Sequence, residues 1–83
     1  MTNWWKCKIL SDNKVTLPFI KGDLVYAKGE AEWIILFDGR REIKIHKLGM
    51  KHIRFLSRLD QKETGRVEWD YQLKKAGQLT NPA

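Results

Sequence analysis

Short apolar runs separated by turn residues recur along the whole 83-residue chain, and this spacing most constrains the fold. The runs are rich in β-branched and aromatic residues at period two, which favours strands over helices. Predicted strands cover residues 4–10, 14–20, 24–28, 32–37, 41–47, 52–59 and 66–73. Because so many short strands share one small chain, we expect a small antiparallel β-barrel. The predicted domain spans residues 1–74, and residues 75–83 are expected to form a frayed tail.

Asp38-Gly39 is the clearest hairpin signal, since a two-residue type I′ turn needs positive φ at both central positions. Two registers are open. A two-residue loop places Trp33 outside the core, across from Lys44, whereas a three-residue loop moves Trp33 and Ile35 into the core. In the first register, the buried face consists of Ile34, Leu36, Ile43 and Ile45. We favour the second register because it separates polar from apolar side chains more completely.

Residues 19–45 carry turn and strand residues in a recognisable order. They are Lys21-Gly22-Asp23-Leu24-Val25, then Trp33, then Gly39 before Ile43 and Ile45. This segment resembles the SH3-like small barrels, including the Tudor and KOW types. The resemblance implies a mostly β, SH3-like antiparallel barrel, an architecture in which many proteins bind nucleic acid or peptides. A further hairpin is predicted from Ile53 to Leu73, with its loop at residues 61–65, so the expected fold has an extra C-terminal hairpin.

The positive charge is concentrated in one segment of the sequence. The formal net charge is +6. Residues 40–58 hold seven bases and the single acid Glu42, while the rest of the chain holds nine bases and nine acids. A local excess of lysine and arginine favours polyanions, because binding to phosphates releases condensed counterions. We therefore predict nucleic-acid binding through Arg40, Arg41, Lys44, Lys47, Lys51, Arg54 and Arg58.

Residues 47–59 admit two structures. The four bases from Lys47 to Arg58 follow one another at spacings of four, three and four, which would align them along one helical face. The same stretch also reads as a strand with Ile53, Phe55 and Leu59 on one side. We favour a strand over residues 52–59 that follows a short turn around Gly49.

The four tryptophans divide into predicted core residues and predicted contacts. Large aromatic residues in a small β domain are usually buried for their apolar area. Trp5 and Trp69 share strand faces with apolar residues and are expected in the core. Trp4, next to basic positions, and Trp33 are the candidate stacking platforms for bases.

The residues needed for catalysis or metal binding are not found in any familiar arrangement. We predict no catalytic residue, no metal site and no cofactor, because Cys7, His46 and His52 lack partners at suitable spacings. The sequence has no apolar run that suits a secretion signal or a membrane span, so we expect a cytoplasmic protein without a membrane partner. Alternative functions are binding to an acidic protein surface, self-association through exposed aromatic residues, or an aromatic cage at Tyr26 and Trp33 for a methylated lysine.

Overall fold

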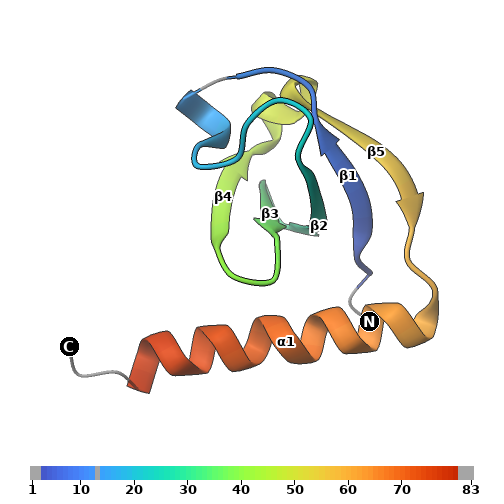
Figure 1. The fold of residues 1–83 in the computed structure, drawn as a ribbon, viewed down its shortest axis with the longest axis vertical. Coiled ribbons are helices and arrows are strands. Elements are labelled where there is room, and N and C mark those ends of the chain that lie inside the picture. The colour runs from blue at the N-terminus through green and yellow to red at the C-terminus, as the bar shows by residue number, and fades with distance from the viewer. Residues whose placement is uncertain (1–2, 13, 81–83) are drawn as a thin grey trace.

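Five antiparallel strands and a long C-terminal helix make up the structure, a computed structural model that describes residues 3–12 and 14–80 (Figure 1). The strands are β1 (Trp5–Ile9), β2 (Leu24–Glu30), β3 (Trp33–Phe37), β4 (Glu42–His46) and β5 (Ile53–Arg58). Two 3-10 helices, η1 (Lys14–Thr16) and η2 (Lys47–His52), and the helix α1 (Gln61–Thr80) complete the chain. The sheet order is β4-β3-β2-β1-β5, so β4 and β5 are its edges.

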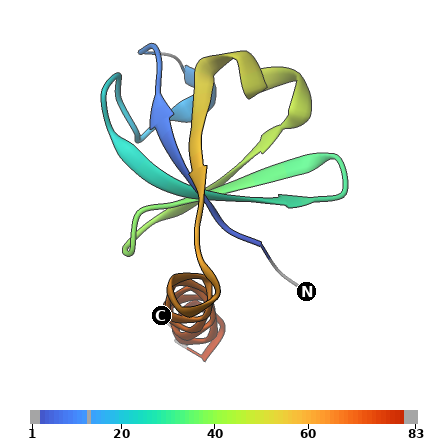
Figure 2. The same cartoon turned by 90° about the vertical axis from the view of Figure 1, so that its right-hand side faces the viewer.

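The sheet is strongly bent (Figure 2). Its inner face holds an apolar core. The side chains of this core are Cys7, Ile9, Phe19, Val25, Ala27, Ile34, Leu36, Ile45 and Ile53. Apart from Phe19, which lies in the loop between η1 and β2, they alternate with outward residues along the strands, as the period-two pattern predicts. The mostly β fold is thereby confirmed, but the structure has no ladder between β4 and β5 in its described part, so the sheet is not closed into a barrel.

Helix α1 occupies the place of the predicted C-terminal hairpin, and that prediction was wrong. The side chain of Asp60 accepts a hydrogen bond from the backbone N–H of Glu63, at 2.7 Å, which caps the first turn. Val67 and Tyr71 lie four residues apart, on the same side of a helix, and both are buried. The alternation of apolar and polar residues over residues 66–73 therefore does not mark a strand, because only Val67 and Tyr71, one helical turn apart, are buried. Residues 75–80, predicted as a frayed tail, continue α1, and residues 81–83 lie outside the described residues.

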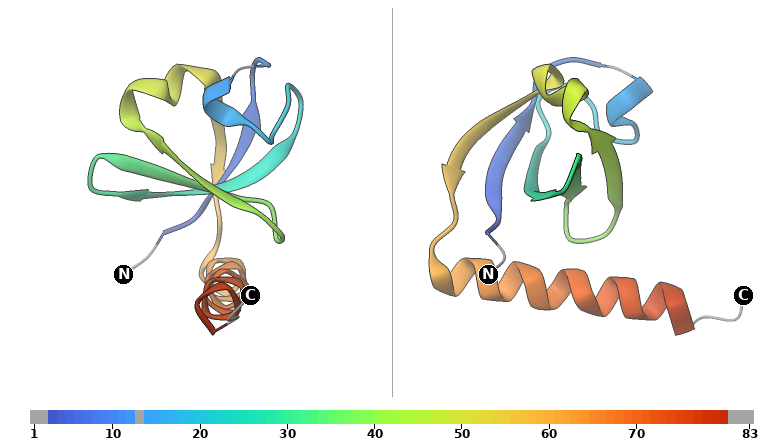
Figure 3. Two further views of the ribbon diagram at one scale, coloured as in Figure 1. Left: turned by 90° about the vertical axis from the view of Figure 1, so that its left-hand side faces the viewer. Right: turned by 180° about the vertical axis from the view of Figure 1, so that it is seen from behind.

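Helix α1 runs across one end of the bent sheet and covers part of its outer face (Figures 1 and 3). A second core forms there from Trp4, Ile35, Phe37, Leu59, Val67 and Tyr71. Strand β3 is consequently buried on both sides, with Ile34 and Leu36 facing inward and Ile35 and Phe37 facing the helix. The burial of Trp4, which has no exposed surface, corrects the prediction that it is a surface contact.

The β3–β4 connection has four residues, and neither predicted loop length is right. The last pair of the ladder is Phe37 with Glu42, and Trp33 pairs with His46. The side chain of Asp38 accepts hydrogen bonds from the backbone N–H groups of residues 40 and 41, both at 2.8 Å, and Gly39 has a φ of 96°. This register has the parity of the two-residue alternative, so Trp33 lies outside the core. The favoured register was wrong because α1 buries the outer face of β3 as well.

The structure contradicts the prediction for residues 14–20 and agrees with the favoured prediction for residues 47–59. The strand predicted for residues 14–20 is absent, and the chain forms η1 and a loop that buries Phe19 in the inner core. Strand β5 follows η2, as the favoured interpretation of residues 47–59 predicted. A side-chain carbon at Gly49 would lie 3.2 Å from Val15 Cγ1, which explains a glycine where η1 approaches η2.

Candidate functional site

The seven bases of residues 40–58 are all exposed, but the fold distributes them along β4, η2 and β5. Arg40 and Arg41 lie in the β3–β4 loop on the α1 side of the sheet, whereas Lys47 and Lys51 belong to η2 at the opposite end (Figure 1). Strands β4 and β5 are the two edges of the sheet. The seven bases therefore do not share one face.

Some of these bases have acidic or polar partners. Arg41 Nη2 lies 3.5 Å from Asp38 Oδ2, and its guanidinium carbon lies 5.6 Å from the centre of the Phe19 ring. Lys44 Nζ lies 3.9 Å from Glu30 Oε1. The two backbone hydrogen bonds from Arg40 and Arg41, together with the charge of Arg41, lower the pKa of Asp38 although burial alone would raise it. The charge of Arg41 is thus locally compensated by Asp38, which reduces the attraction of this base for anions.

A different group of bases gathers on the outer face of β1 and β5, and we call Lys6, Lys8 and Arg54 the open basic patch. Lys8 lies directly opposite Arg54 in the β1–β5 ladder, and Lys6 is two residues before Lys8 on the same side. On β2, Lys6 and Lys8 pair with Tyr26 and Leu24, and on β5 Lys6 pairs with Ser57. None of these partners carries a negative charge. Within the described residues, no carboxylate oxygen lies within 4.0 Å of these three bases. Only Arg54 was among the predicted binding residues.

Among the described residues, the buried base on the outer face under α1 is Lys28. Its ammonium lies 3.3 Å from Glu68 Oε1, 4.4 Å from the centre of the Tyr71 ring and 5.1 Å from that of Trp4. The indole N–H of Trp4 donates to the same carboxylate at 2.8 Å. Lys28, Glu68, Trp4 and Tyr71 form what we call the Lys28 cluster. It joins strand, helix and N-terminal segment, and it uses Trp4 for structure.

Two pKa values record the environment of the Lys28 cluster. Burial raises the pKa of Glu68, but hydrogen bonds from Gln72 and Trp4 and the charge of Lys28 outweigh it, so the pKa is lowered. Burial, followed by the nearby carboxylate of Glu42, raises the pKa of Tyr71. Lys28 therefore faces an ionised carboxylate and a neutral phenol at neutral pH.

Trp33 stays exposed, with 42% of its surface accessible, but it stands among acidic residues. Its neighbours across the ladders are Glu30 on β2 and His46 on β4. The His46 ring contacts Trp33 edge-on at 5.4 Å, and His46 Nε2 lies 3.9 Å from Glu32 Oε2. Tyr26 pairs with Phe37, four positions further along the hairpin from Trp33, so the two rings are roughly 13 Å apart along the strand and form no cage.

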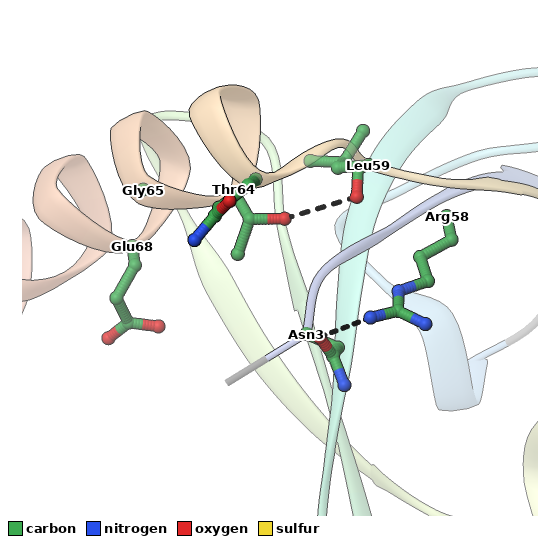
Figure 4. A pocket seen from close by; sticks show the side chains of 7 residues that line it. Asn3, Arg58, Leu59, Thr64, Gly65 and Glu68 are labelled. Carbon is green, nitrogen blue, oxygen red and sulfur yellow. Dashed lines mark hydrogen bonds between the residues drawn. The ribbon is translucent and has the colours of Figure 1, made fainter. Parts of the chain in front are cut away.

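An open depression of about 650 Å³ lies between the start of α1 and the end of β5 (Figure 4). Its lining residues are Asn3, Arg58, Leu59, Gln61, Thr64, Gly65 and Glu68. Arg58 Nη2 donates to Asn3 Oδ1 at 3.1 Å, and Thr64 Oγ1 donates to the Leu59 carbonyl at 3.4 Å. These polar groups are suited to hydrogen bonding with a polar ligand. Sequence reasoning found only Arg58 of this set.

The aromatic residues were partly misassigned by sequence reasoning. Trp69, predicted in the core, is 68% exposed on α1. Trp5 is only partly buried, and its ring lies 5.7 Å from that of Phe55, which is 37% exposed. This pair was missed because the partners are fifty residues apart in sequence.

Cysteine, metal and membrane chemistry can each be checked against the described residues. Burial raises the pKa of Cys7 to about 12, so its thiol is protonated at neutral pH. Residues 3–12 and 14–80 contain no group of three His, Cys, Asp or Glu side chains placed to hold a metal ion. In the same ranges, no helix has the length and apolar character that crossing a membrane requires.

Comparisons with protein-family models, with curated proteins and with solved structures find no match to this chain.

Proposed function

We propose that this protein is a non-catalytic binding module that binds nucleic acid through its open basic patch. The support is the placement of Lys6, Lys8 and Arg54 on adjacent strands, with no carboxylate oxygen of the described residues within 4.0 Å of them. Three cations on one face of two adjacent strands can contact the phosphates of a polyanion together.

The pair Lys8 and Arg54 is the observation that carries the proposal. Like charges directly opposite each other in a ladder cost stability, by roughly 0.2–1 kcal/mol. Elsewhere on the same sheet face, Lys28 and Lys44 are paired with Glu68 and Glu30. An uncompensated pair of this kind is expected where an anionic partner supplies the missing negative charge.

The overall charge agrees with this proposal. The chain carries a net charge of +6, which attracts a polyanion from a distance and accelerates the encounter at low salt. Arg58, Lys51 and Lys47 extend the positive potential along β5 and η2. The patch provides the contacts, and the surrounding bases contribute to the long-range field.

A triple variant tests the proposal. Lys6→Gln, Lys8→Gln and Arg54→Gln together remove the patch without adding negative charge. Binding to labelled DNA, followed by fluorescence anisotropy between about 50 and 200 mM salt, should lose about two to three units of log–log salt slope. The matched control replaces three exposed bases of α1, namely Lys62→Gln, Arg66→Gln and Lys74→Gln. Equal losses in both triple variants would contradict a specific patch.

A second candidate function, self-association, is favoured by one observation. Trp69 and Leu73 lie four residues apart on α1 and are 68% and 52% exposed. Sedimentation equilibrium of the wild type and of Trp69→Gln tests this candidate. A monomer at all concentrations would exclude it.

A further inference from the structure

The aromatic pair at the free edge of the sheet consists of Phe55, which is 37% exposed, and Trp5, which is partly buried. The two ring centres are 5.7 Å apart, with planes inclined at 55°. Phe55 belongs to β5, whose residues after Ile53 are all exposed. By contrast, Trp4, Phe19, Phe37 and Tyr71 are at most 2% exposed. The Phe55 ring thus presents aromatic surface that the two cores do not use, while Trp5 packs partly against the inner core.

Arg58 shares the sheet face of this aromatic pair, and further bases lie on the opposite face of the same two strands. Arg54 precedes Phe55, Lys6 follows Trp5, and Arg58 lies opposite Trp5 in the ladder. The Arg58 guanidinium contacts the amide of Asn3 at 3.1 Å, and among the described residues no carboxylate oxygen lies within 4.0 Å of it. Trp33 lacks such surroundings, since Glu30 and Glu32 lie beside it. Of these two exposed aromatic sites, the Phe55 edge is the one suited to an anion.

From these contacts we infer that the ligand of the basic patch is single-stranded nucleic acid, with bases stacked on Phe55 and Trp5 and a phosphate held by Arg58. This inference rests on the proposed function and adds the class of ligand. Unpaired bases can stack on aromatic side chains, whereas the bases of a duplex are already stacked on one another. The depression beside Arg58 adds the side-chain amides of Asn3 and Gln61, which can hydrogen bond to base edges.

The geometry also explains why one strand suits this site. An extended single strand of nucleic acid can follow β5 from Arg54 to Arg58. Its phosphates would then face the arginine side chains, and its nucleobases would face the rings of Trp5 and Phe55. Lys6 and Lys8 lie on the opposite face of β1 from Trp5, so the ligand contacts the sheet edge from both sides. A rigid duplex could reach the outer lysines but would leave Phe55 unused.

The test compares the affinities for labelled oligothymidine and for a hairpin duplex of equal nucleotide number at one salt concentration. Wild type should bind the single strand more tightly. Phe55→Leu should weaken single-strand binding about 5- to 100-fold and leave duplex binding nearly unchanged. Phe55→Tyr, which keeps a ring, should retain affinity. Trp69→Leu is the matched control, because it removes an exposed aromatic ring from α1.

Each outcome distinguishes this inference from the proposed function. Equal affinity for duplex and single strand, with Phe55→Leu unaffected, overturns the single-strand inference while the charge-dependent binding survives. Failure of wild type to bind either form at low salt overturns both. If Phe55→Leu lowers thermal stability, the wild-type ratio of single-strand to duplex affinity decides, and a ratio of one or less is a negative result.

Discussion

Two halves of the outer sheet face differ in what covers them and in whether their basic side chains have acidic partners. The half beneath α1 buries Trp4, Ile35 and Phe37, and its buried base, Lys28, is compensated by a carboxylate and two rings. The other half, formed by β1, β5 and the start of β2, exposes Leu24 and the open basic patch. The same alternating strands therefore provide a second core at one end and an uncompensated cationic surface at the other.

The largest expected difference between the halves is in side-chain packing. Phe37→Ala should lower the free energy of unfolding by about 3–5 kcal/mol, because Phe37 is 1% exposed and contacts the rings of Trp4 and Tyr71. Leu24→Ala, on the uncovered half, should change it by no more than about 0.5 kcal/mol. Urea denaturation followed by circular dichroism measures both values. Similar losses at the two positions would show that α1 does not protect its half of the sheet.

The next effect concerns the compensated base. Lys28→Ala should cost about 2 kcal/mol, since it removes a partner of Glu68 and two ring contacts in a site that is still partly open to solvent. Lys28→Met, which keeps the aliphatic volume, should cost less. Combining Lys28→Met with Glu68→Gln should recover part of the loss, because no unpaired charge is left. A Lys28→Met protein as stable as wild type would show that the charge contributes nothing there.

Comparison of the two halves also shows what local sequence can predict. Strands β1, β2, β3, β4 and β5 follow from period-two apolar patterns and turn residues, because burial on one side of a sheet leaves that local trace. Helix α1 was missed because Val67, Trp69, Tyr71 and Leu73 alternate by chance. The available signal was Asp60 followed by Glu63, an acidic N-cap with a carboxylate three residues on.

Register and the binding surface were harder to predict for a shared reason. The β3–β4 parity depends on α1 burying Ile35 and Phe37 from the far side, a tertiary effect with no local trace. The charge count over residues 40–58 located a surplus in sequence, but the fold sends those bases to both sheet edges. Lys6 and Lys8 become relevant only when β1 pairs with β5.

A substitution on the uncovered half should have a smaller effect, and it should stabilise the protein where the previous substitutions destabilise it. Lys8→Glu places a carboxylate opposite Arg54 and should raise the free energy of unfolding by about 0.2–1 kcal/mol. The same change should weaken nucleic-acid binding, because it reverses a charge in the patch. Lys74→Glu on α1 is the control for the change in net charge. A Lys8→Glu protein that is destabilised and binds normally would contradict the assignment of the patch.

The smallest effect follows from the lowered pKa of Glu68, which makes the stability of the half beneath α1 depend on pH. A carboxyl group with a lower pKa in the folded state stabilises the protein above its unfolded value, here about 4.5, and loses that contribution as the pH falls through the folded value. The difference in stability between wild type and Glu68→Gln should therefore be constant at neutral pH and shrink below about pH 4.5. Asp38 also has a lowered pKa, but it is present in both proteins, so its contribution cancels in this difference. Thermal unfolding at a series of pH values measures the difference. A gap that persists unchanged into acid would mean that Glu68 acts through hydrogen bonding and packing, and that the charge of Lys28 is not compensated by it.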